Sequence, residues 1–147
     1  MKHEELTKRI IGIYYDVYNE LGHGFLESVY QKALLIAFRE AGINAEAKKK
    51  LRVYFRGQAV GDFEIDLIVE GMVLLETKGG KSLAPEHEAQ ILNYLRATTI
   101  EVGLLMNFGP KAEFRRFAFD NERKKGLPPQ RPGEVVEKGR EAADEHG

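Results

Sequence analysis

The fold of this chain is decided by residues 61–78, GDFEIDLIVEGMVLLETK, where two apolar runs are separated by Glu70 and Gly71. The runs predict a β-hairpin, and its register determines which side chains share a face. A strict two-residue turn pairs Ile65 with Glu76 and mixes charged and apolar side chains on both faces. A three-residue loop with Gly71 at positive φ produces one nearly apolar face. We therefore predict the second register, whose apolar face contains the pairs Val69–Val73, Leu67–Leu75 and Ile65–Thr77.

The second register gathers charged side chains on the other face of the hairpin. It sets Asp66 opposite Glu76, and Glu64 opposite Lys78. Glu64 and Lys78 suit a cross-strand ion pair on a solvated sheet face. Like charges directly opposed on two strands cost about 0.2–1 kcal/mol, and a divalent cation shared by Asp66 and Glu76 would remove that repulsion. Carboxylate oxygens suit Mg²⁺ or Mn²⁺, which keep several waters and take further oxygens from a substrate phosphate.

Composition limits the class of protein. The chain has 147 residues, 43% of them apolar, which fits one globular domain. It has no cysteine, so disulfides, thiolate nucleophiles and cysteine-ligated metal sites are excluded. No stretch approaches the roughly 18–20 apolar residues of a membrane span, and residues 1–5 lack the apolar core of a signal peptide. We therefore expect a cytoplasmic protein with no membrane partner.

Charge gives a weaker indication of the partner. The net charge is −1, with 22 basic and 23 acidic residues, so no overall positive field indicates nucleic acid. Basic residues nevertheless cluster at 48–56, where Lys48, Lys50 and Arg52 are candidates for phosphate contacts. Arg115 and Arg116 would extend that surface if they lie on the same side. Lysine also serves on exposed strand edges to block edge pairing, and both interpretations stay open.

Periodicity predicts eight elements. Apolar residues at helical spacing predict helices over residues 4–21, 25–40 and 85–97. Strand patterns cover 47–56, 59–69, 72–78, 100–107 and 113–119. The order α-α-β-β-β-α-β-β predicts a mixed α/β (α+β) domain over 1–120, with a mixed central sheet of about five strands flanked by helices. The Pro, Gly and mixed charge of residues 121–147 predict a flexible tail outside this domain.

Residues 24–30, GFLESVY, supply a recognisable motif. Further fragments are GDFEIDLIV at 61–69, LETK at 75–78, His87 through Asn93-Tyr94-Leu95, and GLLMNFG at 103–109. In this order and spacing the chain resembles the GxxExxY protein family, within the PD-(D/E)XK nuclease superfamily, over roughly residues 8–120. The resemblance implies the restriction-endonuclease-like core of that superfamily, and the predicted order of elements agrees with it.

The resemblance also implies roles for individual residues. Asp66 and Glu76 would bind the metal, and Lys78 would position or activate the attacking water. Glu27 would add a third acid to the metal site. An alternative for Glu27 is structural, because Gly24 resembles an N-cap and a carboxylate at the third helical position would answer free N–H groups. The motif, which is named for this glutamate, favours the metal role.

The third predicted helix carries a second group of candidates. Gln90 and Tyr94 are four residues apart and lie on one helix face, with His87 one turn earlier. They resemble the Gln-x-x-x-Tyr element of the RecB-like branch, which contacts DNA near the cleavage site. The alternative is an amphipathic helix with a packed tyrosine and a solvated glutamine. For His87 we expect a supporting or capping role.

The function implied is Mg²⁺- or Mn²⁺-dependent hydrolysis of phosphodiester bonds in nucleic acid, with DNA favoured over RNA. One alternative is a module that binds nucleic acid or protein without cutting. Another is an assembly module, a homo-oligomer in which strand 103–108 or the first helix is buried between subunits. The complete set of acids and lysine favours the enzyme.

Overall fold

The computed structural model describes residues 1–125, 130 and 132–133. Its helices and strands are α1 (Glu4–Leu21), α2 (Glu27–Glu40), β1 (Ala45–Phe55), β2 (Gln58–Val69), β3 (Val73–Lys78), α3 (Pro85–Ala97), β4 (Val102–Phe108) and β5 (Ala112–Ala118), followed by the short 3₁₀ helix η1 (Asn121–Arg123). This is the predicted order, and every boundary lies within two residues of the predicted one.

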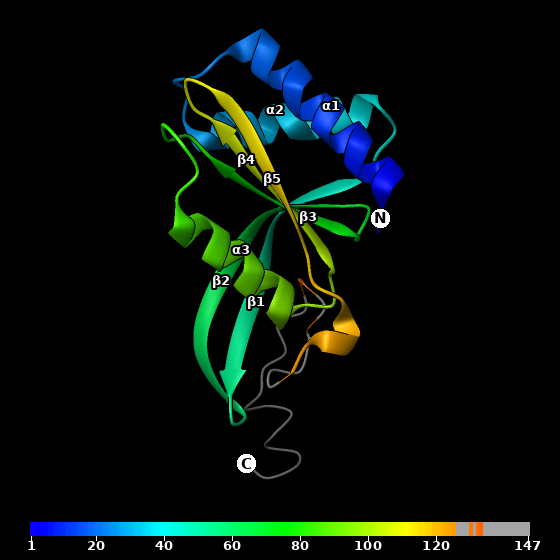
Figure 1. Cartoon of the computed structure of the whole chain (residues 1–147), viewed down its shortest axis with the longest axis vertical. Coiled ribbons are helices and arrows are strands. Elements are labelled where there is room, and N and C mark those ends of the chain that lie inside the picture. The colour runs from blue at the N-terminus through cyan, green and yellow to red at the C-terminus, as the bar shows by residue number, and fades with distance from the viewer. Residues whose placement is uncertain (126–129, 131, 134–147) are drawn as a thin grey trace.

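The five strands form one mixed sheet in the order β1-β2-β3-β4-β5. Among the strands that the structure describes, only β3 and β4 are parallel neighbours, because the connection between them is long enough to contain α3. The helices α1 and α2 cover one face of the sheet and α3 covers the other (Figure 1). The chain is therefore a three-layer mixed α/β domain, as the sequence predicted.

Each face of the sheet buries its own apolar core. The core under α1 and α2 includes Tyr14, Leu34 and Leu75. The core under α3 includes Leu74 and Ile91. Neighbouring residues of β3 thus enter opposite cores, which explains why its sequence is a continuous apolar run. Among the described helices, none is long and apolar enough to cross a membrane.

The β2–β3 hairpin has the predicted register at its turn. Val69 pairs with Val73, Ile68 with Leu74 and Leu67 with Leu75. Gly71 has a φ of 66°, as expected, and Glu70 is also at positive φ, 53°. The ladder ends at Leu67 and Leu75, so the hairpin opens into a fork before Asp66.

The predicted pairs beyond that point are wrong. Ile65 lies in the core under α3 instead of facing Thr77 beside Leu67. Glu64 lies beyond the end of the β2–β3 ladder, so it has no ladder partner in β3 and is paired only with Lys50 of β1. Opposite Asp66, β1 has Lys48 at a positive φ of 56°, and the ladder between β1 and β2 skips this position while keeping the same register on both sides of it.

Two further expectations concern the edges of the domain. The strand β4 is buried along its whole length between β3 and β5, so the alternative that placed it between subunits is wrong. Most of the predicted flexible tail lies outside the described residues. Of its described residues, Gln130 pairs with Thr98 through a parallel β-bridge, and the Gly133 amide donates to the Lys50 carbonyl at 2.9 Å.

Candidate active site

Asp66 and Glu76 occupy the fork between β2 and β3, and each carboxylate binds the backbone of the other strand. The Asp66 N–H donates to Glu76 Oε2 at 2.9 Å, and the Thr77 N–H donates to Asp66 Oδ2 at 2.8 Å. These side-chain hydrogen bonds replace the backbone ladder, which is the physical reason that the hairpin opens here. The two acids are therefore close neighbours, as predicted, although they are not a directly opposed ladder pair.

The environment of the two carboxyl groups disfavours their ionisation. Glu76 is only 3% exposed, and burial, followed by the charge of Asp66, raises its pKa to about 8. Burial also raises the pKa of Asp66, against the hydrogen bonds that it accepts from Thr77. Neither carboxylate forms an ion pair with another described residue. The site thus holds two neighbouring acids with no bound positive partner of their own.

Lys78 contributes positive charge to the surroundings of both acids. It is half-buried at the end of β3, beside Asn107 of β4, and its charge lowers the pKa of Asp66 and of Glu76. It makes no ion pair with Glu64 or with any other described residue. The sequence left two roles open for Lys78, an ion pair with Glu64 and a contribution to the metal site. The structure shows no ion pair with Glu64, and the charge of Lys78 acts on the two acids instead.

Glu27 approaches the same site from α2. It is the first residue of the helix, with Leu26 as the N-cap, so the predicted third position and Gly24 cap are wrong. The residue as a whole is exposed, but partial burial of its carboxyl group raises the pKa of Glu27. The charge of Lys78 lowers this pKa, and the charge of Asp66 raises it. Glu27 therefore lies close to the acids without contacting them.

The rest of the Gly-x-x-Glu-x-x-Tyr motif holds the loop that precedes Glu27. The Tyr30 side chain is fully buried, and its hydroxyl donates to the Gly22 carbonyl at 2.7 Å and accepts from the Phe25 N–H at 3.2 Å. Gly24 has a φ of 110°, which a side chain would disfavour. The glycine and the tyrosine thus fix the path of the chain into α2, and with it the position of Glu27.

Two functional neighbours were missed in the sequence. Thr77 is fully buried, and its hydroxyl lies 3.0 Å from Asp66 Oδ2, to which it donates. Gln31 Nε2 donates to that same hydroxyl at 3.0 Å. Gln31 lies four residues after Glu27, on the same face of α2, and this spacing could have indicated that Gln31 lies near the site. The two side chains link α2 to Asp66 and orient its carboxylate.

The candidates on α3 lie on the other side of the acids. Gln90 Nε2 donates to the Tyr94 hydroxyl at 3.0 Å, and burial, followed by the charges of Glu76 and Asp66, raises the pKa of Tyr94 to about 12. The Gln90–Tyr94 pair therefore borders the acids. His87 Nδ1 accepts the Ala84 N–H at 3.2 Å at the start of α3, which is the capping role expected of it.

The basic residues do not form one surface. Lys48 and Lys50 are exposed on β1, whereas Arg52 forms an ion pair with Asp62 at 2.7 Å. The arginines at 115 and 116 lie on β5, at the opposite edge of the sheet, so the extended surface considered for them with β1 is wrong. Of the three β1 candidates, Lys48 and Lys50 form no ion pair with a described residue, and Lys50, which lies on the opposite face of the strand from its neighbour Leu51, points away from α3.

The donor set suits a divalent cation such as Mg²⁺ or Mn²⁺. Asp66 Oδ1 and Glu76 Oε1 accept no hydrogen bond from a described residue. Mg²⁺ is commonly bound by one or two carboxylates, with water and substrate phosphate completing its coordination. In the part of the chain that is described, no group of three or more His, Cys, Asp or Glu is placed to hold a metal. Two acids therefore fit, and Glu27 as a direct ligand stays a prediction.

Comparison with known proteins identifies the family. The model of the PD-(D/E)XK nuclease superfamily matches residues 4–117, which include every helix and strand from α1 to β5 except the last residue of β5. Neither the comparison with curated proteins nor that with solved structures gave a match. The matched region contains the whole candidate site, and the chain belongs to the PD-(D/E)XK nuclease superfamily.

Proposed function

We propose that this domain is a Mg²⁺- or Mn²⁺-dependent nuclease that hydrolyses phosphodiester bonds of nucleic acid, with DNA preferred over RNA. The observation that carries the proposal is the pair of carboxyl groups at the fork, with Glu76 buried and Asp66 half-buried, which have no ion-pair partner among the described residues. Such a pair is unfavourable by itself, because burial and like charge both oppose ionisation. A divalent cation would offset both effects, and membership of a nuclease superfamily supports the same conclusion.

In this proposal each side chain of the fork has a separate task. Asp66 and Glu76 hold the ion through their free oxygens, while their other oxygens stay bonded to the backbone. The ion, when bound, supplies Lewis-acid stabilisation of the charge that develops on the phosphoryl oxygens. Lys78 orients the attacking water or stabilises negative charge, since its charge acts on both carboxyl groups and it forms no ion pair with a described residue. Thr77 and Gln31 keep Asp66 in place.

The nucleic acid would reach the acids along α3 and β1. Lys48 and Lys50 are exposed and suited to sequence-independent contacts with phosphates. Gln90 and Tyr94 border the acids and would contact the nucleotide next to the scissile bond. DNA is proposed over RNA on the resemblance to the RecB-like branch alone. Glu27, exposed at the start of α2, would join the site when the ion and substrate are present.

Nicking of labelled single-stranded and duplex DNA and RNA in the presence of Mg²⁺ or Mn²⁺ tests the proposal. We expect cleavage that EDTA abolishes and that Asp66→Asn, Glu76→Gln and Lys78→Ala each reduce by at least about a hundredfold. Lys81→Ala is the matched control for Lys78→Ala, because Lys81 is exposed and three residues further along. Glu27→Gln should also reduce cleavage, and its control is Glu40→Gln, at the other end of α2, about 20 Å away.

Cleavage that persists in both Glu76→Gln and Lys78→Ala would contradict the proposal, because it would come from another site or from a contaminant. Nucleic acid bound tightly but never cut, with any divalent ion, would favour the alternative of a binding module on the same fold. Both outcomes use the whole chain and the same oligonucleotides, so they can be distinguished in one set of experiments.

A further inference from the structure

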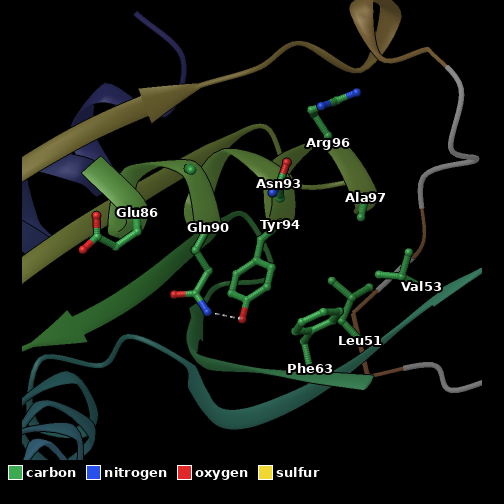
Figure 2. A pocket seen from close by; sticks show the side chains of 10 residues that line it. Leu51, Val53, Phe63, Glu86, Gln90, Asn93, Tyr94, Arg96 and Ala97 are labelled. Atoms are coloured by element: carbon green, nitrogen blue, oxygen red, sulfur yellow. Dashed lines mark hydrogen bonds between the residues drawn. The ribbon is translucent and has the colours of Figure 1, made fainter. Parts of the chain in front are cut away.

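A cavity of about 440 Å³ lies between α3 and the ribbon formed by β1 and β2 (Figure 2). Its apolar wall includes Leu51 and Val53 of β1 and Ala97 of α3. The Tyr94 side chain descends from α3 toward the sheet, and Phe63 rises from β2 beside Leu51 (Figure 2). The volume lies within the range of about 300–1,000 Å³ that small-molecule sites occupy.

Two aromatic rings border the cavity without covering one another. The centroids of Phe63 and Tyr94 are 6.1 Å apart, and the ring planes are tilted by 59°. Phe63 is 44% exposed, although it lies in the middle of a strand next to a core. An aromatic ring that stays partly open at the rim of an apolar cavity is suited to stack on a flat ligand.

The polar groups of the cavity suit a neutral ligand with hydrogen-bonding edges. Gln90 uses its amide N–H to bond the Tyr94 hydroxyl, and its carbonyl oxygen has no partner among the described residues. The charged lining residues are one acid and one base, Glu86 and Arg96, both exposed. Since these charges balance, the cavity does not select an anion such as a free phosphate.

The cavity adjoins the acids of the fork. Phe63 precedes Asp66 by three residues of β2, a distance of about 10 Å along a strand. Tyr94 lines the cavity, and its hydroxyl is near enough to Glu76 and Asp66 for their charges to raise its pKa. A ligand in the cavity would therefore be next to whatever the acids bind.

We infer that this cavity binds one unstacked nucleobase of a single-stranded nucleic acid, with Phe63 as the stacking surface and Gln90 at the polar edge. The inference rests on the proposed nuclease function and specifies its substrate. A base inside a duplex is paired and stacked, so it cannot enter a cavity of this kind unless it leaves the helix. The domain should therefore act on single strands, or on unpaired segments next to a duplex.

Fluorescence anisotropy with the full-length Glu76→Gln protein in EDTA tests this inference, because that variant should not cut the probe. The probes are a labelled single-stranded oligonucleotide, the blunt duplex of the same sequence, and the single strand with one abasic nucleotide at successive positions. We expect at least about tenfold tighter binding of the single strand than of the duplex. Adding Phe63→Ala should weaken single-strand binding by about ten- to a hundredfold, the usual range for one stacked base.

Control variants separate stacking from general effects. Phe55→Ala removes another exposed aromatic side chain, at the tip of β1 and outside the cavity, and should leave binding unchanged. Phe63→Trp should keep tight binding, whereas Phe63→Leu, which keeps an apolar side chain, should not. One abasic position should weaken binding of the Phe63-containing protein and have no further effect on Phe63→Ala. Thermal unfolding followed by circular dichroism reports whether each variant is folded.

The inference is overturned if Phe63→Ala and Phe55→Ala bind the single strand equally well, or if duplex and single strand bind alike. These results would leave the nuclease proposal intact wherever the parent protein still cuts in a Glu76-dependent way. Conversely, a parent protein that never cuts, but whose single-strand binding depends on Phe63, would remove the nuclease proposal and retain the base site.

Discussion

Replacing Glu76 by glutamine should stabilise the metal-free protein at alkaline pH. The pKa of Glu76 is raised from its ordinary 4.5 to about 8, first by burial and then by the charge of Asp66. Below pH 4.5 the carboxyl is protonated in the folded and the unfolded chain, so stability is fully present there. Between pH 4.5 and 8 the unfolded chain releases the proton and the folded chain keeps it. The free energy of unfolding therefore falls as pH rises through this range and levels off above it.

The magnitude follows from the same interval. At about 1.4 kcal/mol per pH unit, the loss is at most about 5 kcal/mol. We expect about 2–4 kcal/mol, because the surroundings of a buried carboxyl group relax and admit water when it ionises. Glutamine keeps an acceptor for the Asp66 N–H and has no charge to bury. Glu76→Gln should therefore melt about 5–15 °C above the parent at pH 8.5, and within a few degrees of it at pH 5.

Urea unfolding in EDTA at pH 5, 6.5 and 8.5 measures this difference. Burial lowers the pKa of Lys124 to about 8, but this group is common to both proteins and cancels in the comparison. Glu40→Gln, at the exposed C-terminal end of α2, is the control and should change stability equally at each pH. A Glu76→Gln effect that is the same at all three pH values would show that ionisation of Glu76 does not destabilise the fold.

Three other predictions address the site and its support. Mn²⁺ at a hundred times its Kd should raise the free energy of unfolding of the parent protein by about 2.7 kcal/mol. Thermal melts should show no such stabilisation of Asp66→Asn. Equal stabilisation of the parent and of Asp66→Asn would place the ion elsewhere. Gly109→Ala should destabilise by about 3 kcal/mol or more, because its Cβ would lie 1.8 Å from the Gly80 carbonyl oxygen. Gly79→Ala should be near neutral, because a Cβ at Gly79 would have no other heavy atom within 4 Å. Comparable urea midpoints for the two variants would show that Gly109 does not pack closely against Gly80. Gln31→Ala should cost about 1 kcal/mol and slow nicking, whereas the exposed neighbour Lys32→Ala should do neither; identical rates for the two would show that Gln31 does not orient Asp66.

The apolar pattern was sufficient to predict the turn of the central hairpin. A register slip at Val69 and Val73 would have moved a whole row of apolar side chains into solvent, so the sequence had one acceptable solution there. The same pattern could not predict the fork. The carboxylates of Asp66 and Glu76 take backbone N–H groups that a regular ladder would have used, and this competition is not visible in hydrophobicity.

The sequence was also insufficient wherever the result depends on distant elements. The positions of Arg115 and Arg116 relative to β1 follow from the strand order, which places β5 at the far edge. The open ring of Phe63 depends on the separation of α3 from β2, which no local pattern encodes. In the sequence, Thr77 was visible only as the residue between Glu76 and Lys78. Its contact with Asp66 arises because the β2–β3 ladder ends at Leu67 and Leu75, before Asp66 and Glu76.

Whether Asp66 and Glu76 bind a divalent ion is tested most directly by a crystal of the full chain soaked in Mn²⁺, with diffraction data collected at the manganese absorption edge. We expect an anomalous peak between the carboxylates of Asp66 and Glu76, and no peak there in crystals of Glu76→Gln. A peak on other residues, or a fork without a peak in crystals that bind Mn²⁺ elsewhere, would contradict this expectation.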